Sequence, residues 1–364
     1  MPEEKISVAQ VQAAITASRA NWTAGYTSVS ELSLEEKQMR LGVLPPPGGF
    51  ERVMQQAAAA QAPMAAEQMG LPAAYDLRNV GGKNFITDVK DQQNCGSCVA
   101  FGVCATIEGQ YRVQRGDPNL VINLSEAHLF FCQGKAQGVT CGTGWMPDKA
   151  LACATNPGIA DEACYPYDLA KTDCSTLCSD WQAHVTRITG FHGVGADNIK
   201  AALTTKGPVE ACFVVYEDFY TYTGGVYKHV TGGQVGGHCV SIIGYDDKLG
   251  CWMVKNSWGT GWGEKGFFRI AYRDCAIDTW AVYAADGIEE TMWLNNRRVL
   301  GLWTCDQDRN AYAYLDGNVG WRRIAYDNDV VFADMLMELA AARIANRPIN
   351  VYEDHGVLKQ AYVF

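Results

Sequence analysis

Almost every position from residue 99 to residue 107 is apolar, and a polar loop, residues 91–97, comes directly before this run. A helix that is apolar on all faces is usually buried, so the pattern predicts a buried helix. Ser97 is a residue type that caps helices, and we expect the helix to begin at Cys98, with only that residue facing outward. Unpaired backbone N–H groups and the helix dipole favour a thiolate at this position, and the thiolate is the nucleophilic form of cysteine.

A second pattern begins near residue 209, where short runs of β-branched and aromatic residues alternate with glycine-rich turns. Such runs are typical of strands, whereas the segments from Ser125 and at residues 147–153 favour helices. The central part of the chain therefore predicts a helical half followed by a sheet half, which is an α+β arrangement. The expected strands are residues 212–215, 239–243, 251–254 and 266–270.

Residues 1–70 differ in texture from the rest because they contain no cysteine. Capping boxes predict two short helices, one beginning after Ser7 and one after Ser33. Gly42 and the proline-rich turn that follows it would stop the second helix. The alanine- and glutamine-rich residues 55–70 indicate an exposed linker, the kind of segment that proteases cut first. From these features alone the region is either an accessory helical arm or a segment that is removed on maturation.

Residues 289–364 contain enough aromatic and aliphatic side chains to favour a folded unit over a disordered tail. We expect either a small α+β module or a five-stranded barrel-like one. Its elements are predicted as strands at 311–315 and 320–325, a helix at 330–346, and strands at 349–352 and 357–364. The apolar face of that helix consists of Phe332, Met335, Leu336, Leu339 and Ala342.

Three aromatic residues of this C-terminal region, Tyr312, Tyr314 and Trp321, are expected to be exposed. Aromatic residues are enriched at binding surfaces, so we interpret the region as a targeting or assembly module. Stabilisation of the preceding domain is the alternative.

Composition narrows the class of protein. The 364 residues are 48% hydrophobic and 19% charged, as in an ordinary globular protein. A net charge of −10 argues against a nucleic-acid partner, and no apolar run reaches the length of about 18 residues that a membrane span needs. Fourteen cysteines favour a secreted, lysosome-like or periplasmic compartment, although residues 1–5 lack the features of a signal peptide.

The run Cys-Gly-Ser-Cys at residues 95–98, with Gln92 upstream, resembles the active-site segment of papain-like cysteine proteases. That family has a histidine and an asparagine roughly 130–150 residues downstream. His238, after two glycines, lies 140 residues beyond Cys98, and Asn256, in an Asn-Ser-Trp-Gly run, lies 158 residues beyond it. The resemblance implies the papain-like fold of two subdomains, with the cysteine and the histidine on opposite walls of a cleft.

The resemblance also implies a role for each of these residues. Cys98 attacks a peptide carbonyl, and His238 takes the thiol proton and later returns it to the leaving amine, so the two form a thiolate–imidazolium pair. Asn256 orients the imidazole, and Trp258 shields that hydrogen bond from water. The Gln92 amide and the backbone N–H of Cys98 stabilise the developing oxyanion.

Three further runs, at residues 21–25, 41–42 and 52–54, resemble the propeptide of cathepsin B-like proteases, and residues 71–78 resemble the start of the mature enzyme. The resemblance implies a latent zymogen whose prosegment crosses the cleft in the direction opposite to substrate and acts as an intramolecular inhibitor. The chain then divides into the prosegment at 1–70, the catalytic domain at 71–288 and the C-terminal module at 289–364.

Peptide or protein substrates are implied, together with a set of residues that contact them. The backbone of Gly144 is expected to pair with an extended substrate, and Gly237 and Trp258 lie beside it. By the same register the second subsite is walled by Trp145, Met146, Cys212, Gly236 and Cys239 and floored by Trp280, which stands where cathepsin B carries an acid. Small or medium apolar side chains should fit this subsite, and an arginine should not.

The span between Cys164 and Cys174 corresponds to the loop that makes cathepsin B a carboxydipeptidase. It contains nine residues and no histidine, so we expect an open cleft and an endopeptidase. Two motifs depart from the family pattern, with Val99 in place of tryptophan and Cys-Gly-Thr-Gly at residues 141–144 in place of Cys-Asn-Gly-Gly. Neither change removes a group that transfers a proton.

The remaining cysteines fit a disulfide framework. The resemblance implies the pairs Cys95–Cys141, Cys132–Cys174 and Cys164–Cys178, and further bridges between Cys104 and Cys153 and between Cys212 and Cys239 are possible. No set of cysteine and histidine residues has the paired spacing of a zinc site, and we expect neither a metal nor a cofactor.

Two other functions compete with the protease. Cys95 and Cys98 have the spacing of a thiol–disulfide oxidoreductase, but no βαβ pattern surrounds them, and His238 and Asn256 would have no role. A catalytically inactive homologue that binds peptides is the second alternative, although every catalytic position is filled.

Overall fold

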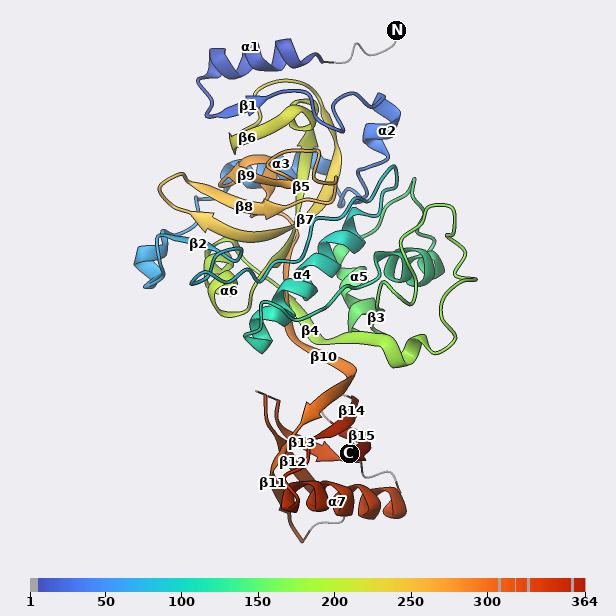
Figure 1. Cartoon of the computed structure of the whole chain (residues 1–364). Coiled ribbons are helices and arrows are strands. Elements are labelled where there is room, and N and C mark those ends of the chain that lie inside the picture. The colour runs from blue at the N-terminus through green and yellow to red at the C-terminus, as the bar shows by residue number, and fades with distance from the viewer. Residues whose placement is uncertain (1–5, 307–308, 318, 326–327, 355–356, 364) are drawn as a thin grey trace. The chain divides into compact units, whose positions relative to one another are not determined.

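The computed structural model describes residues 6–306, 309–317, 319–325, 328–354 and 357–363 (Figure 1). The chain forms two compact units, each with its own core. The first comprises Met1–Cys178 and Ile188–Ile288, and the second comprises Ser179–Arg187 and Glu289–Phe364. No helix in the described residues is both long enough and apolar enough to cross a membrane.

The N-terminal region contains three helices and a short strand: α1 (Val8–Ser18), β1 (Trp22–Ala24), α2 (Leu34–Gln38) and α3 (Gly49–Ala59). Both predicted capping boxes are present, at Ser7 and Ser33. Helix α2 ends at Gln38, earlier than the predicted stop at Gly42, because the chain turns there into an extended segment that crosses the active site.

Helix α3 was not predicted, and it corrects the expectation of an exposed linker at residues 55–70. It begins after Gly48, whose φ of 93° is a conformation that glycine adopts without strain. Val53 and Ala57 on its inner face are buried against the catalytic domain. Only residues 60–65 form a mostly exposed, non-helical stretch before the short turn at Ala66–Met69.

The helical half of the catalytic domain is built on α4 (Cys98–Arg115), which ends at Gly116 in the left-handed conformation. Thirteen of the eighteen residues of α4 are buried, as its apolar sequence predicts. A π-helical segment, His128–Gly134, and α5 (Pro147–Thr155) lie at the other two predicted helical sites. Phe130, Trp145 and Leu151 belong to the core that these elements share with α4.

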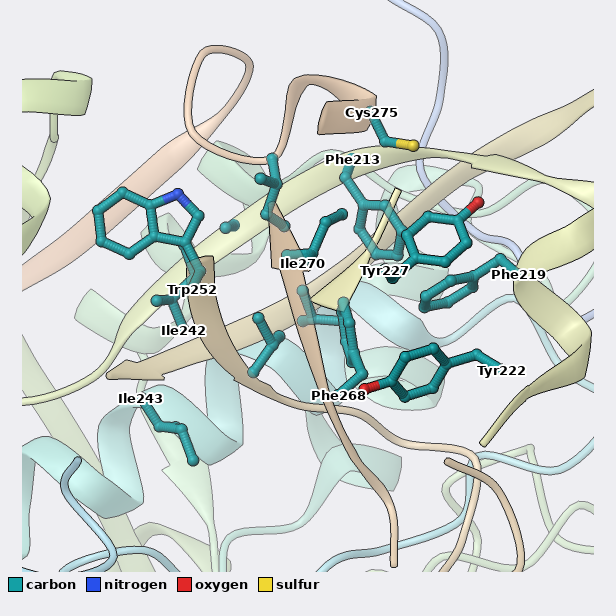
Figure 2. Close-up of a cluster of buried hydrophobic side chains, with 14 of the residues drawn as sticks. Phe213, Phe219, Tyr222, Tyr227, Ile242, Ile243, Trp252, Phe268, Ile270 and Cys275 are labelled. Atoms are coloured by element: carbon teal, nitrogen blue, oxygen red, sulfur yellow. The ribbon is translucent and has the colours of Figure 1, made fainter. Parts of the chain in front are cut away.

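The sheet half is mainly antiparallel. Strand β7 lies between β5 and β8, β8 pairs with β9, and β9 pairs in parallel with β6. The core includes Phe213, Phe219, Tyr222 and Phe268, whose rings gather in Figure 2. The strands are β5 (Val209–Tyr216), β6 (Tyr222–Tyr227), β7 (Gln234–Asp246), β8 (Cys251–Lys255) and β9 (Phe267–Ala271).

The remaining elements lie in this unit in whole or in part, since β4 and β10 both extend into the second unit. Strand β2 pairs with the end of β7, β3 pairs with β4, and the first residues of β10 pair with β5. Their bounds, with that of the remaining helix, are β2 (Ala74–Asp76), β3 (Ile159–Ala160), β4 (Val185–Gly193), α6 (Ile199–Thr205) and β10 (Val282–Arg297).

Three disulfides cross-link the helical half. They are the pairs implied by the family resemblance, Cys95–Cys141, Cys132–Cys174 and Cys164–Cys178. The further bridges are not formed, and Cys104, Cys153, Cys212 and Cys239 are free thiols.

The surroundings of these four free cysteines differ. Cys212 and Cys239 face each other across β5 and β7, but the Cys239 thiol donates a hydrogen bond to Glu210 Oε1 at 2.9 Å. Cys104 is fully buried within α4, whereas Cys153 lies half-buried beside Gln137.

The second unit is an open mixed sheet with one helix against it, so it is α+β and not barrel-like. The strand order is β10–β14–β15–β13–β12–β11, and no described residue of β11 pairs with β10 to close it. Met335, Leu339 and Ala342 of α7 are buried in its core, as the predicted apolar face requires. The elements are β11 (Val299–Thr304), β12 (Ala311–Leu315), β13 (Gly320–Ile324), α7 (Asp329–Ile344), β14 (Ile349–Asp354) and β15 (Val357–Val363).

Sequence reasoning missed β11 and the end of β10, and thus both edge strands of this sheet. The last residue of the predicted strand at 357–364, position 364, lies outside the described residues. Residues 1–5 of the predicted N-terminal segment also lie outside them.

Candidate active site

Cys98 is the first residue of α4, as predicted, but it does not face solvent. Its side chain is fully buried beneath the N-terminal region. Ser97 occupies the N-cap position without making the predicted capping bond, because its hydroxyl is hydrogen-bonded to the Tyr167 hydroxyl at 2.7 Å. The rigid position of the thiol therefore comes from the buried helix and from Tyr167, whose own hydroxyl also bonds the Gln92 carbonyl.

His238 lies on β7, and Asn256 directly follows β8, the neighbouring strand. Asn256 Oδ1 is 2.7 Å from His238 Nε2, and it also accepts the Ser257 backbone N–H. The indole of Trp258 is fully buried, with its centroid 4.8 Å from that of the imidazole. The histidine is thus fixed in orientation and screened from water. Its Nδ1 is buried without a hydrogen-bond partner, which leaves that nitrogen available for proton transfer.

The Gln92 side chain is held at both ends. Its Oε1 accepts from the Ser257 hydroxyl at 2.7 Å, and its Nε2 donates to the Cys95 carbonyl at 2.8 Å. The same Nε2 donates to the Arg40 carbonyl at 3.0 Å. An amide that donates to a peptide carbonyl here is positioned to donate to the carbonyl of a substrate. Arg40, in the N-terminal segment, occupies this donor.

The extended segment after α2 lies across the site. Val43 donates its N–H to the Gly237 carbonyl at 3.1 Å, and the Gly42 carbonyl accepts from Trp145 at 2.8 Å. Gly144 has a φ of 70°, and a side chain there would overlap the Gly42 carbonyl. The backbone hydrogen bond expected of Gly144 is made by Trp145, and Gly144 instead supplies close approach.

Ionic contacts anchor the same segment. The Arg40 guanidinium bonds Asp91 at 3.0 Å, directly before Gln92. Glu36 Oε1 accepts a bond from Asn94 at 3.3 Å. The N-terminal segment is therefore held on the loop that precedes Cys98.

Burial shifts the pKa values of the catalytic pair in opposite directions, and both shifts disfavour the expected ionised forms. It raises the pKa of the Cys98 thiol to about 12, although backbone N–H groups of Cys239, Gly42 and Val99 favour the thiolate. Burial lowers the pKa of His238 to about 4, with only partial compensation from Asn256. Both shifts favour a neutral thiol and a neutral imidazole. The predicted thiolate–imidazolium pair is therefore disfavoured in this covered state.

The subsite residues do not all act through their side chains. The Trp145 indole is buried in the core, where its Nε1 donates to Gln137, so only the backbone of this residue faces the cleft. Trp280 packs edge-on against Phe50 of α3, with a centroid distance of 5.5 Å. Phe50 and Trp280 both crowd Gly237, since an added Cβ there would lie 2.9 Å from each.

Other subsite residues lie deeper. Cys212 and Cys239 are fully buried behind these groups, and Leu41 covers Gly236. Met146 is half-buried at the N-cap of α5.

A buried charge network behind the site escaped sequence reasoning. Lys90 Nζ lies 2.7 Å from Glu126 and 3.4 Å from Glu108, and both carboxylates are almost fully buried. Lys255, next to Asn256, donates to Thr87, which donates to Glu108. Burial lowers the pKa of Lys255 to about 8. The available signal was an acidic residue, Glu108, directly after the apolar run of α4 and a lysine beside Asn256.

A thiol at a buried helix N-terminus, an oriented histidine and an amide donor define the active site of a cysteine protease, here covered by its own N-terminal segment. The model of the papain family of cysteine proteases matches residues 71–285. The chain therefore belongs to the papain family.

Relatives and solved structures agree with this assignment. Cathepsin B-like CP2 of Giardia intestinalis is 34% identical over 221 residues, which are 57% of this chain and 72% of that protein. The gut-specific cysteine proteinase of Caenorhabditis elegans is 35% identical over 238 residues, with the same coverage.

Procathepsin B S9 from Trypanosoma congolense superposes with a TM-score of 0.61 at 25% identity, over 77% of this chain and 98% of its own. Procathepsin L 3 of Tenebrio molitor gives 0.60 at 26% identity, over 76% and 87%. The protein is a papain-family cysteine protease with the fold of a procathepsin.

Proposed function

We propose that this chain is the latent zymogen of an endopeptidase in which Cys98 is the nucleophile and His238 the general base. Asn256 orients the imidazole, and Gln92 with the Cys98 backbone N–H binds the oxyanion. The observation that carries the proposal is the bond from Gln92 Nε2 to the Arg40 carbonyl beside the buried thiol. A peptide carbonyl already occupies the donor that substrate requires.

Removal of the prosegment exposes the pair to water, which removes the burial that disfavours both charges. The proton of Cys98 then passes to His238, and the thiolate attacks the substrate carbonyl. The negative charge that develops on the carbonyl oxygen is stabilised by Gln92. The imidazolium returns the proton to the leaving amine, and water then hydrolyses the thioester.

Endopeptidase action is proposed because the span between Cys164 and Cys174 contains only nine residues and is tied at both ends by disulfides, to Cys178 and to Cys132. This span carries no histidine to bind a C-terminal carboxylate. We expect internal cleavage of a long peptide by the mature enzyme, with the same products when its C-terminus is amidated. Stepwise loss of C-terminal dipeptides that amidation abolishes would refute endopeptidase specificity.

The second subsite is proposed to prefer small or medium apolar side chains, because Trp280 fills its depth and offers no carboxylate. Trp280→Glu should raise kcat/KM about tenfold for a peptide whose arginine enters the second subsite, because the new carboxylate compensates the desolvated guanidinium. Trp280→Gln is the matched control, because it has the same size but no charge. The measurement is kcat/KM with two peptides that differ only at that position. A wild-type preference for arginine would show the pocket assignment to be wrong.

Acid is proposed to release the prosegment. Asp247 holds its C-terminal part by accepting the Ala66 N–H at 2.7 Å, and it also pairs with Lys200 at 2.6 Å. Partial burial alone would raise the pKa of Asp247, but bonds from Lys200, Tyr272 and Ala66 lower it below its usual 3.8. A lowered pKa means that this anchor is complete above about pH 3.8 and is lost as the pH falls through the folded value.

Asp247→Asn should therefore speed processing at pH 5, where wild-type Asp247 is still charged. The measurement is the rate at which a new N-terminus appears, followed by sequencing. Glu67→Gln, an exposed neutralisation in the same segment, should leave the rate unchanged. Full activity of the intact chain before any cleavage would contradict latency itself.

The C-terminal module is proposed to serve targeting or assembly. The proposal is supported by Tyr314 and Trp321, which are 39% and 50% exposed as expected, and by Trp303, which is 47% exposed on the same face of the sheet. Tyr312, which was also expected to be exposed, is half-buried beside Trp303. A chain that ends at Gly287 should hydrolyse peptides normally after activation. Failure of that chain to fold would favour a stabilising role for the module instead.

The framework of three disulfides supports an oxidising location, either secreted or lysosome-like.

A further inference from the structure

A cavity of about 710 Å³ lies between the prosegment and the catalytic domain, away from the active site. One wall is the end of α1 and the residues after it, Ser18–Asn21. The other walls come from β6, β9 and the segment before β8. The two parts are firmly joined here, since β1 pairs with β6 and Val226 donates its N–H to the Asn21 carbonyl at 2.8 Å (Figure 1).

The charged side chains that line this cavity are all basic, and one of them, His229, has its Nδ1 3.2 Å from Asp218 behind the lining. Arg19, Lys228, Lys248 and Arg269 line it together with His229, and no acidic residue does. Arg269 is neutralised by Glu264 at 2.6 Å. Within the described part of the chain, the side chains of Arg19, Lys228 and Lys248 have no carboxylate partner.

Three unpaired cations around one cavity stand out in a chain whose net charge is −10. Like charges held together repel one another, and a bound anion removes that cost. A cavity of this volume is typical of small-molecule sites.

We propose that this cavity binds a small molecule carrying two or more phosphate or sulfate groups. Arg19 belongs to the prosegment, whereas Lys228 and Lys248 belong to the catalytic domain. A ligand held by all three therefore binds the zymogen more tightly than the mature enzyme. By linkage, the same ligand stabilises the closed prosegment and delays activation.

Binding is measured first, by calorimetry with the full-length Cys98→Ala chain, which cannot process itself. Inorganic pyrophosphate is the probe for phosphorylated ligands, and sucrose octasulfate is the probe for sulfated sugars. At least one probe should bind, and its affinity should fall as salt rises. The mature enzyme should bind that probe at least about tenfold more weakly, the loss expected when about 1.4 kcal/mol of binding free energy is removed. The same loss is expected for the full-length chain that carries Arg19→Gln, Lys228→Gln and Lys248→Gln together.

Lys83→Gln with Lys149→Gln is the matched control, because both lysines are exposed and lie outside the cavity. This variant should bind like the wild-type sequence. Failure of both probes to bind, or equal binding by the cavity variant, overturns the site.

The effect on latency rests on the proposed zymogen function and is measured separately. With the wild-type chain at a fixed acid pH, the bound probe should lengthen the lag before the new N-terminus appears. Binding without a longer lag would keep the site and refute its role in latency. Activity of the uncleaved chain without any probe would instead refute the zymogen proposal.

Discussion

A zymogen carrying Gly42→Val is expected to be active before any cleavage. A side chain at Gly42 would overlap the backbone carbonyl of Gly96, and Gly42 also lies against the backbone of Gly144. Neither neighbour is the flexible end of a side chain, so the prosegment must lift. Overpacking of this kind costs about 3 kcal/mol, which shifts the balance between covered and open sites about 100-fold.

The measurement is labelling of uncleaved chain by an irreversible electrophilic peptide inhibitor at neutral pH, resolved by size. Labelling should be faster in the variant, because opening removes the burial that raises the pKa of Cys98. Ala58→Val, an exposed change on α3, is the control and should stay latent. After cleavage both variants should match wild-type enzyme, which separates latency from misfolding. A fully latent Gly42→Val chain would show that the Arg40–Leu44 segment does not block the site.

Cys98→Ala is expected to abolish peptide hydrolysis, with a loss of about 10⁴-fold or more, because the nucleophile is removed and the other groups have nothing to activate. The full-length variant should also stay unprocessed in acid, yet be cut at its prosegment when wild-type enzyme is added. Fluorogenic peptide hydrolysis and N-terminal sequencing measure the two effects.

Cys153→Ala is the matched control, since Cys153 is a free, half-buried thiol outside the site. It should retain activity. Residual activity in Cys98→Ala above that of a heat-denatured sample would assign the nucleophile elsewhere. Cys95 cannot replace it, because it is fully buried in the bridge to Cys141.

Local sequence predicted the elements whose pattern is local. The apolar run after Ser97 produced α4, and both capping boxes produced α1 and α2 at the predicted residues. Periodicity also located the helix and four strands of the C-terminal module within a few residues. It missed β11, where Gly301 and a register shift interrupt the strand pattern. It also missed α3, whose helical register depends on packing of Val53 and Ala57 against another part of the chain.

Sequence determined the residue types of the site and their order along the chain, because spacing between motifs is visible without a fold. Tertiary structure decided their environment. The burial of Cys98 and His238, which disfavours both of the expected charges, arises from a segment more than 50 residues from the nucleophile in sequence.

The same holds for the orientation of side chains. Trp145 turns into the core, Ser97 bonds Tyr167 instead of capping its helix, and Cys239 bonds Glu210 instead of Cys212. Each outcome is a competition between partners from distant segments. A single sequence shows which groups are present, but only the folded chain brings the competing partners within hydrogen-bond distance.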